Sequence, residues 1–276
     1  MCKGIHLARE RMIAVNTFKW ISHEQMYVDE IHVEKCGPLS VGVYGGNQES
    51  DAYERGDAVL AWWDPELQFE FVMIFDTHHK TKNINYIIEA ISERKEKLKE
   101  LFSYPIHLAF HHTHMYLLAL FTDELFIEKC DQNDEELACL ICLRKGEFLY
   151  WLSVGDCFAY LFHSEQTKNG KGRLNKRKNY EYIGRKNIFA ANTPCFTSGV
   201  RGLEKGTNHI VMATDGILEC DKRRFDDDQS LVEILHDGNS LQIEPVLTNV
   251  LQWKGRDCAT IIGWSIDTEN RQCANS

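Results

Sequence analysis

The chain has 276 residues and a formal net charge of −10 at pH 7, and 43% of its residues are hydrophobic. This composition suits a globular protein with a large core, and the negative charge argues against general nucleic-acid binding, which requires a basic surface. We find no apolar run of the roughly 18 to 20 residues that a membrane span needs, and no signal-peptide core near the start. We therefore expect a cytoplasmic protein that contacts neither nucleic acid nor membrane.

The first 24 residues show no clear periodicity, so their structure is left open. Residues 26–35 partly alternate between polar and apolar side chains, which indicates an edge strand. A second short strand is expected over Leu39–Val43, before a Gly-Gly pair and the polar loop Asn47–Ser50.

The most informative stretch is Phe69–His79, an apolar run that ends in Asp76. Such a run fits a strand buried on both faces, and residues 58–63 fit its hairpin partner across a tight turn. A carboxylate at the end of a buried strand costs several kcal/mol unless a cation or donor compensates it. Asp76 therefore indicates a site, and the alternative is that it caps the helix that follows.

Two long helices are expected next, over residues 83–102 and 106–129, separated by Pro105. The second helix places His107, His111 and His114 on one face. Zinc binding there is conceivable, but no glutamate completes a hydrolase motif, so we favour histidines that are hydrogen-bonded or solvated.

Two strands are expected over residues 137–143 and 147–162, the second interrupted at 154–157. The first contains Cys139 and Cys142 at the spacing of a thioredoxin motif, but positions three apart on a strand face opposite sides, so we expect reduced, structural thiols. Residues 168–186 hold eight basic side chains. They form either a solvated flap or a landing surface for phosphorylated or acidic partners.

The remaining pattern is a strand that ends at Asp215, helices over 229–236 and after Pro245, and a last strand over 259–266 that follows Asp257. Strand groups separated by helices, without regular βαβ alternation, predict an α+β fold of two antiparallel sheets between helical layers. We divide the chain into an N-terminal extension (1–36), one domain (37–268) and a C-terminal tail (269–276).

Asp76, Asp215 and Asp257 each lie at the end or the start of an apolar strand. Carboxylates gathered at the ends of strands repel one another and need a cation, and oxygen-only ligands favour Mg²⁺ or Mn²⁺. Two such ions about 4 Å apart would activate a bridging water for phosphoryl transfer.

Five short motifs, in order along most of the chain, resemble those of the metal-dependent serine/threonine phosphatases of the 2C type, particularly bacterial members. They are Asn47-Gln48-Glu49-Ser50, Asp76-Thr77-His78, Val154-Gly155-Asp156-Cys157, Ala213-Thr214-Asp215-Gly216 and Asp257-Cys258-Ala259-Thr260. The resemblance implies a four-layer αββα sandwich and a metal-dependent phosphatase that acts on phosphoserine or phosphothreonine in proteins, with a role in signalling.

The resemblance also implies roles for individual residues. Asp76, Asp215 and Asp257 would bind two Mn²⁺ or Mg²⁺ ions, together with the Thr77 carbonyl and with Glu49 directly or through water. Asp156 and Glu219 would hold a third, looser ion, and His78 would be the general acid for the leaving oxygen.

The chain departs from the family pattern at several positions. Tyr44 stands where the family has a phosphate-binding arginine, Thr77 and Glu49 replace a glycine and an aspartate, and residues 135–138 replace a small-residue element. A lost charged contact worth roughly 1.5 to 3 kcal/mol would slow turnover about ten- to a hundredfold unless another group such as Arg201 substitutes. The alternative is a weak or inactive relative that binds phosphoproteins or regulatory partners.

Overall fold

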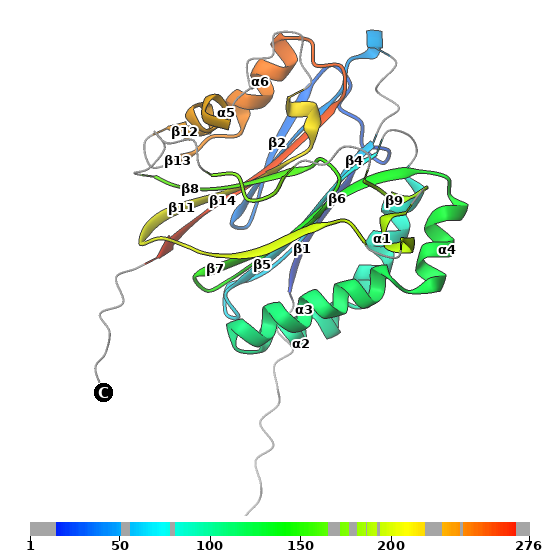
Figure 1. Ribbon diagram of the computed structural model, residues 1–276. Helices are drawn as coiled ribbons and strands as arrows, with labels where there is room; N and C mark the ends of the chain where they lie inside the picture. Colours follow the sequence, from blue (N-terminus) through cyan, green and yellow to red (C-terminus); the bar gives the residue numbers. More distant parts are fainter. Residues whose placement is uncertain are drawn as a thin grey trace, which may run out of the picture.

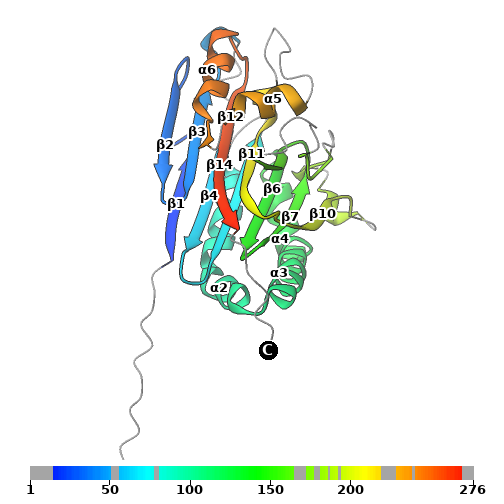
Figure 2. The same cartoon turned by 90° about the vertical axis from the view of Figure 1, so that its left-hand side faces the viewer.

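The chain forms two large antiparallel sheets with helices on both outer sides (Figure 1), as seen in a computed structural model. This is the predicted α+β fold of four αββα layers, and the view turned by 90° in Figure 2 shows the same arrangement. The structure describes residues 15–50, 56–77, 81–164, 172–176, 181–185, 187–191, 194–218, 228–237 and 240–268.

The first sheet has the strand order β1-β4-β5-β6-β7-β10, with β9 also paired to β6. The predicted hairpin is confirmed as β4 and β5, whose register joins Gly56 to Thr77 and Asp64 to Phe69. The strands are β1 (Asn16–Ile21), β4 (Gly56–Asp64), β5 (Phe69–Thr77), β6 (Glu136–Lys145), β7 (Phe148–Val154), β9 (Ile183–Gly184) and β10 (Thr197–Gly202).

The second sheet has the order β2-β3-β14-β11-β8, and β2 lies at its edge as predicted. Both β1 and β2 fall within residues 1–36, and β2 pairs along its length with β3. The boundary that the sequence placed at residue 36 thus falls between two paired strands. The strands are β2 (Ile31–Cys36), β3 (Leu39–Gly45), β8 (Phe158–His163), β11 (Gly206–Ala213) and β14 (Cys258–Thr268), and β12 (His236–Asp237) and β13 (Ser240–Leu241) form a small third sheet.

Helices α1 to α4 cover the outer face of the first sheet, and α5 and α6 cover that of the second (Figure 1). No helix among the described residues is long and apolar enough to cross a membrane. The helices are α1 (Lys82–Glu93), α2 (Lys95–Ser103), α3 (Ile106–Phe121), α4 (Glu124–Gln132), α5 (Asp228–Leu235) and α6 (Glu244–Gln252), with short 3₁₀ turns at Gln48–Ser50 (η1), Ile188–Ala190 (η4) and Asp215–Ile217 (η5).

Three of the predicted elements were too long. The helix expected over 83–102 breaks at Arg94, and that expected over 106–129 breaks at Asp123, whose side chain accepts a 3.0 Å bond from the Phe126 amide and caps α4. The interrupted strand over 147–162 is two strands in different sheets, β7 and β8. Asp156 therefore lies where the chain crosses between the sheets.

Buried apolar side chains form three layers, one under each helical cover and one between the sheets. Cys139 belongs to the layer beneath α1 to α4 and Cys142 to the layer between the sheets, so the two thiols face opposite sides of β6 as predicted. Burial raises the pKa of both, which favours inert thiols.

Candidate metal centre

Three buried carboxylates meet where the two sheets approach each other. Asp76 comes from the end of β5, Asp156 from the crossover between β7 and β8, and Asp215 from η5 directly after β11. One carboxylate oxygen from each lies within 4.8 Å of the others, and none of the three residues is more than 7% exposed. The fold thus brings together residues as distant in the sequence as Asp76 and Asp215, which are 139 positions apart.

Two more aspartates contribute to this group. The pKa of Asp76 is raised well above its ordinary value, chiefly by burial and then by the charges of Asp215, Asp57 and Asp257. Asp257, immediately before β14, is itself buried. Asp57 and Asp257 therefore lie close enough to Asp76 to act on it electrostatically.

Asp57 is the residue that sequence reasoning missed. It lies opposite Asp76 in the β4–β5 register and is 1% exposed. Burial is the largest cause that raises its pKa to about 8, and hydrogen bonds from Thr260 and Thr214 oppose this. The expected strand began at residue 58, one position after Asp57, so Asp57 was not recognised as a member of the hairpin; extending the hairpin register by one residue places it opposite Asp76.

The donors suit a hard divalent cation. All are buried carboxylate oxygens, and burial and mutual repulsion disfavour the ionised forms of Asp57 and Asp76. Bound Mg²⁺ or Mn²⁺ would remove this cost, because oxygen ligands are the ones these ions prefer.

Close backbone contact explains the glycine after Asp215. A Cβ atom on Gly216 would lie 1.8 Å from the Cys258 carbonyl oxygen, so only glycine lets η5 approach the start of β14. Thr77, which follows Asp76, is 1% exposed and donates its hydroxyl to the Glu136 carbonyl oxygen at 2.9 Å. Its side chain thus anchors the end of β5 to β6.

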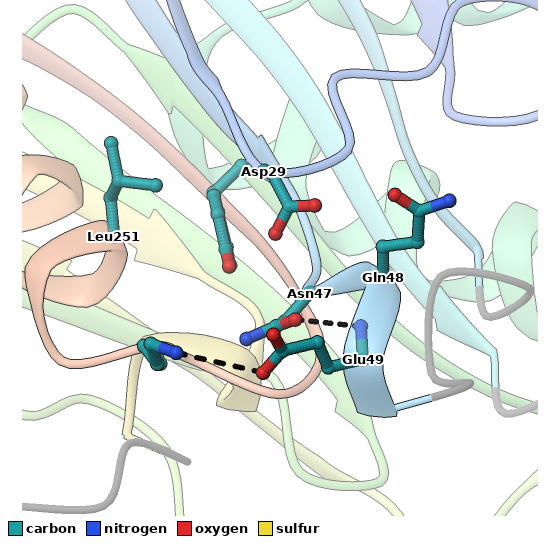
Figure 3. A pocket seen from close by; sticks show the side chains of 7 residues that line it. Asp29, Asn47, Gln48, Glu49 and Leu251 are labelled. Carbon is teal, nitrogen blue, oxygen red and sulfur yellow. Dashed lines mark hydrogen bonds and ion pairs between the residues drawn. The ribbon is translucent and has the colours of Figure 1, made fainter.

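Glu49 lies apart from the group of Asp76, Asp156 and Asp215. Its side chain is 80% exposed and pairs with Lys254 at 3.5 Å. It lines a separate pocket of about 490 Å³ with Asp29 and Leu251 (Figure 3), and Tyr44 also contributes to the lining.

Two of the departures from the family pattern have structural roles. Tyr44 is 1% exposed and donates its hydroxyl to the Gly255 carbonyl oxygen at 3.0 Å, and burial raises its pKa to about 12. Glu135 accepts bonds from the amides of Lys82 at 3.3 Å and Asn83 at 2.8 Å, which caps the start of α1.

Some of the predicted residues lie outside the part of the chain that the structure describes. They are His78, Glu219 and, within the basic stretch 168–186, residues 168–171, 177–180 and 186. Arg201 is exposed on β10, at the edge of the first sheet.

No protein-family model matches the sequence, and no curated protein sequence matches it. Solved structures do share its fold. A bacterial serine phosphatase matches with a TM-score of 0.59 and 12% identity over 87% of this chain and 100% of its own. The serine/threonine phosphatase of Staphylococcus aureus matches with a TM-score of 0.57 and 11% identity, covering 95% of this chain and 100% of its own. That of S. agalactiae gives a TM-score of 0.53 and 13% identity, over 91% and 100%. The expected resemblance is confirmed at the level of the fold.

Proposed function

We propose that the protein is a metal-dependent phosphatase that hydrolyses phosphoserine or phosphothreonine in proteins. The observation that carries this proposal is the buried group of Asp76, Asp156 and Asp215 at the junction of the two sheets. The fold shared with bacterial serine/threonine phosphatases supports it. The proposal includes a role in cytoplasmic signalling.

Asp76, Asp215 and Asp257 are the proposed ligands of two Mn²⁺ or Mg²⁺ ions, with Asp156 and Glu219 at a third, weaker position. When bound, such ions activate a water molecule and stabilise the charge that develops on the phosphoryl oxygens. We assign Asp57, rather than the exposed Glu49, as the additional carboxylate of the centre.

The chain's own residues perform the remaining tasks. Asp57 fixes Thr214 and Thr260 and so positions Asp215 relative to Asp76. The crowded carboxylates repel a phosphate dianion unless cations neutralise them, which makes substrate binding depend on metal. His78 is the proposed general acid that gives a proton to the leaving serine or threonine oxygen.

The proposal is tested by hydrolysis of p-nitrophenyl phosphate and of a phosphothreonine peptide in Mn²⁺, in Mg²⁺ and in EDTA. We expect turnover only with metal, and its loss in Asp215→Asn. Asp267→Asn is a matched control, because it removes an exposed carboxylate near the far end of β14.

Unchanged hydrolysis in Asp215→Asn would contradict the proposal.

The second candidate function is a non-catalytic module that binds phosphoproteins. It is favoured because Tyr44 is buried and its hydroxyl is hydrogen-bonded to the Gly255 carbonyl oxygen. Tight phosphopeptide binding by folded, Mn²⁺-loaded protein without phosphate release would establish that module instead.

A further inference from the structure

A second pocket, of about 600 Å³, lies between α3 and the outer strands β7 and β10. Its size falls within the roughly 300–1,000 Å³ typical of small-molecule sites. On the helix, His107, Phe110, His111 and His114 form one stripe at the spacing i, i+3, i+4 and i+7. The pocket is therefore lined by His107, His111 and His114, and none of these histidines belongs to the metal centre.

The opposite wall is formed by the first sheet. Phe148 and Tyr150 lie two positions apart on β7 and so face the same side of the sheet, and the same holds for Ser198 and Val200 on β10. Val200 lies directly opposite Tyr150. Because β10 is the edge strand and carries small side chains here, the space beside α3 stays open. Val200 is 51% and Phe148 39% exposed, so the pocket opens to solvent.

The wall of the pocket is apolar and contains no Asp, Glu, Lys or Arg among its described residues. Its only groups that can carry charge near neutral pH are imidazoles, and their charge can only be positive. Burial raises the pKa of Tyr150, so that its hydroxyl stays protonated. This wall disfavours an organic cation and favours an anion with a large apolar part.

The histidines divide into two kinds. His114 is partly buried, and its Nδ1 is hydrogen-bonded to the Tyr150 hydroxyl at 3.0 Å, with the two rings edge to face. His107 and His111 are exposed at the mouth of the pocket. A ligand could thus place its apolar body inside against Phe110 and Tyr150 while two imidazoles meet a charged group at the entrance.

A zinc site on these histidines has less support. The only group of three or more potential ligand atoms within 4.8 Å among the described residues is the aspartate group of the metal centre. The apolar walls would also contribute nothing to a bare ion, whereas they would bury an aromatic or aliphatic body favourably.

We propose that this pocket binds a small, largely apolar organic acid, with its ring or chain against Phe110, Phe148 and Val200 and its carboxylate against His107 and His111. The site is separate from the proposed phosphatase centre. Tyr150 lies four positions before the end of β7 at Val154, about 13 Å of extended strand, and Asp156 follows two positions later.

The test compares three probes of one shape but different charge: 4-phenylbutyrate, 4-phenylbutan-1-ol and 4-phenylbutan-1-amine, each titrated by calorimetry into the full chain. We expect the acid to bind, the alcohol to bind at least about tenfold more weakly, and the amine to show no measurable binding. Equal affinity for acid and amine would overturn the proposal.

Two variants locate the binding. Val200→Trp fills the pocket from an exposed position and should abolish acid binding, and His111→Ala should weaken it at least about tenfold. His23→Ala is the matched control, because His23 is an exposed histidine outside the pocket and its loss should leave the affinity unchanged.

Acid binding that survives both Val200→Trp and His111→Ala would refute the assignment. Stoichiometric Zn²⁺ binding that is lost in His111→Ala, without binding of the acid, would replace the proposal with a metal site. Circular dichroism of each variant verifies that it is folded. None of these readouts depends on phosphatase activity, so the pocket and the proposed reaction are tested independently.

Discussion

The carboxylate of Asp57 accepts a hydrogen bond of 2.6 Å from the hydroxyl group of Thr260, 203 positions away in the sequence. It accepts a second bond of 2.9 Å from Thr214, whose hydroxyl oxygen in turn accepts the Thr260 amide at 2.9 Å. Asp57 belongs to the first sheet, whereas Thr260 belongs to the second and Thr214 follows one of its strands. One buried carboxylate thus joins the two sheets beside Asp76.

Asp57→Asn should weaken Mn²⁺ binding by about 10- to 100-fold, the usual effect of losing a residue that orients metal ligands. The charge is lost while the shape is kept, so the fold should persist. Calorimetric titration of Mn²⁺ measures the change. Glu49→Gln is the matched control and should leave the affinity unchanged, since Glu49 pairs with Lys254 at the surface; the reverse ranking would assign the role to Glu49.

Protein stripped of metal should become less stable as the pH rises from about 5 to 9. The pKa of Asp57 is raised in the folded protein to about 8, from an ordinary value near 3.9. Its protonation therefore stabilises the folded state, fully below about pH 4, and this contribution is lost as the pH rises through about 8. Thermal unfolding in EDTA should show a falling Tm, by about 2–4 °C for each kcal/mol lost.

Saturating Mn²⁺ should raise the Tm more at pH 8 than at pH 5, because metal binding requires ionised carboxylates. In Asp57→Asn the decline in EDTA should be shallower. A wild-type Tm in EDTA that is flat or rises between pH 5 and 8 would contradict the raised pKa.

Tyr44→Phe should lower the free energy of unfolding by about 0.5–1.5 kcal/mol, because the Gly255 carbonyl loses its partner. The same variant should leave the KM for p-nitrophenyl phosphate unchanged, since the hydroxyl is bonded to the backbone of the loop before Asp257. Urea unfolding and steady-state kinetics measure the two effects. A large rise in KM would instead indicate that Tyr44 contacts the phosphate.

Glu135→Ala should destabilise the protein by about 1–3 kcal/mol, because two amides at the start of α1 lose their acceptor. The neighbouring variant Glu136→Ala is the control, and it should cost less than about 0.5 kcal/mol because the Glu136 carbonyl that accepts the Thr77 hydroxyl remains. Equal losses in the two variants would argue against the cap.

Arg144→Met should cost about 3–5 kcal/mol, since it leaves the buried charge of Glu70 without its partner. The double variant Arg144→Met with Glu70→Leu should be more stable than Arg144→Met alone, because no unpaired charge remains buried. Urea unfolding of both variants gives the comparison. A double variant less stable than the single one would contradict the cost that we assign to the unpaired Glu70 charge.

The sequence by itself determined the fold class, the β4–β5 hairpin and the opposite facing of Cys139 and Cys142. These features follow from the local spacing of apolar residues, which reflects whether one face or both faces of a helix or strand are buried. The sequence also singled out Asp76, Asp215 and Asp257, because an ionisable side chain next to a buried apolar run is costly unless a cation or a donor compensates it. Asp156 was expected at the site only from the resemblance to the phosphatase motifs.

Only the tertiary structure decided which carboxylates meet. Glu49 precedes β4, and Asp57 lies near the start of β4, where it pairs with β5. Yet Glu49 is exposed beside Lys254, whereas Asp57 is buried and bonded to Thr214 and Thr260. The tertiary structure also showed that β7 and β8 belong to different sheets. It showed further that the Tyr44 hydroxyl donates to the Gly255 carbonyl oxygen and that Glu135 accepts bonds from the first amides of α1. The physical reason is that these contacts join positions up to 211 residues apart, as between Tyr44 and Gly255, and such pairings depend on how whole sheets pack rather than on any local pattern.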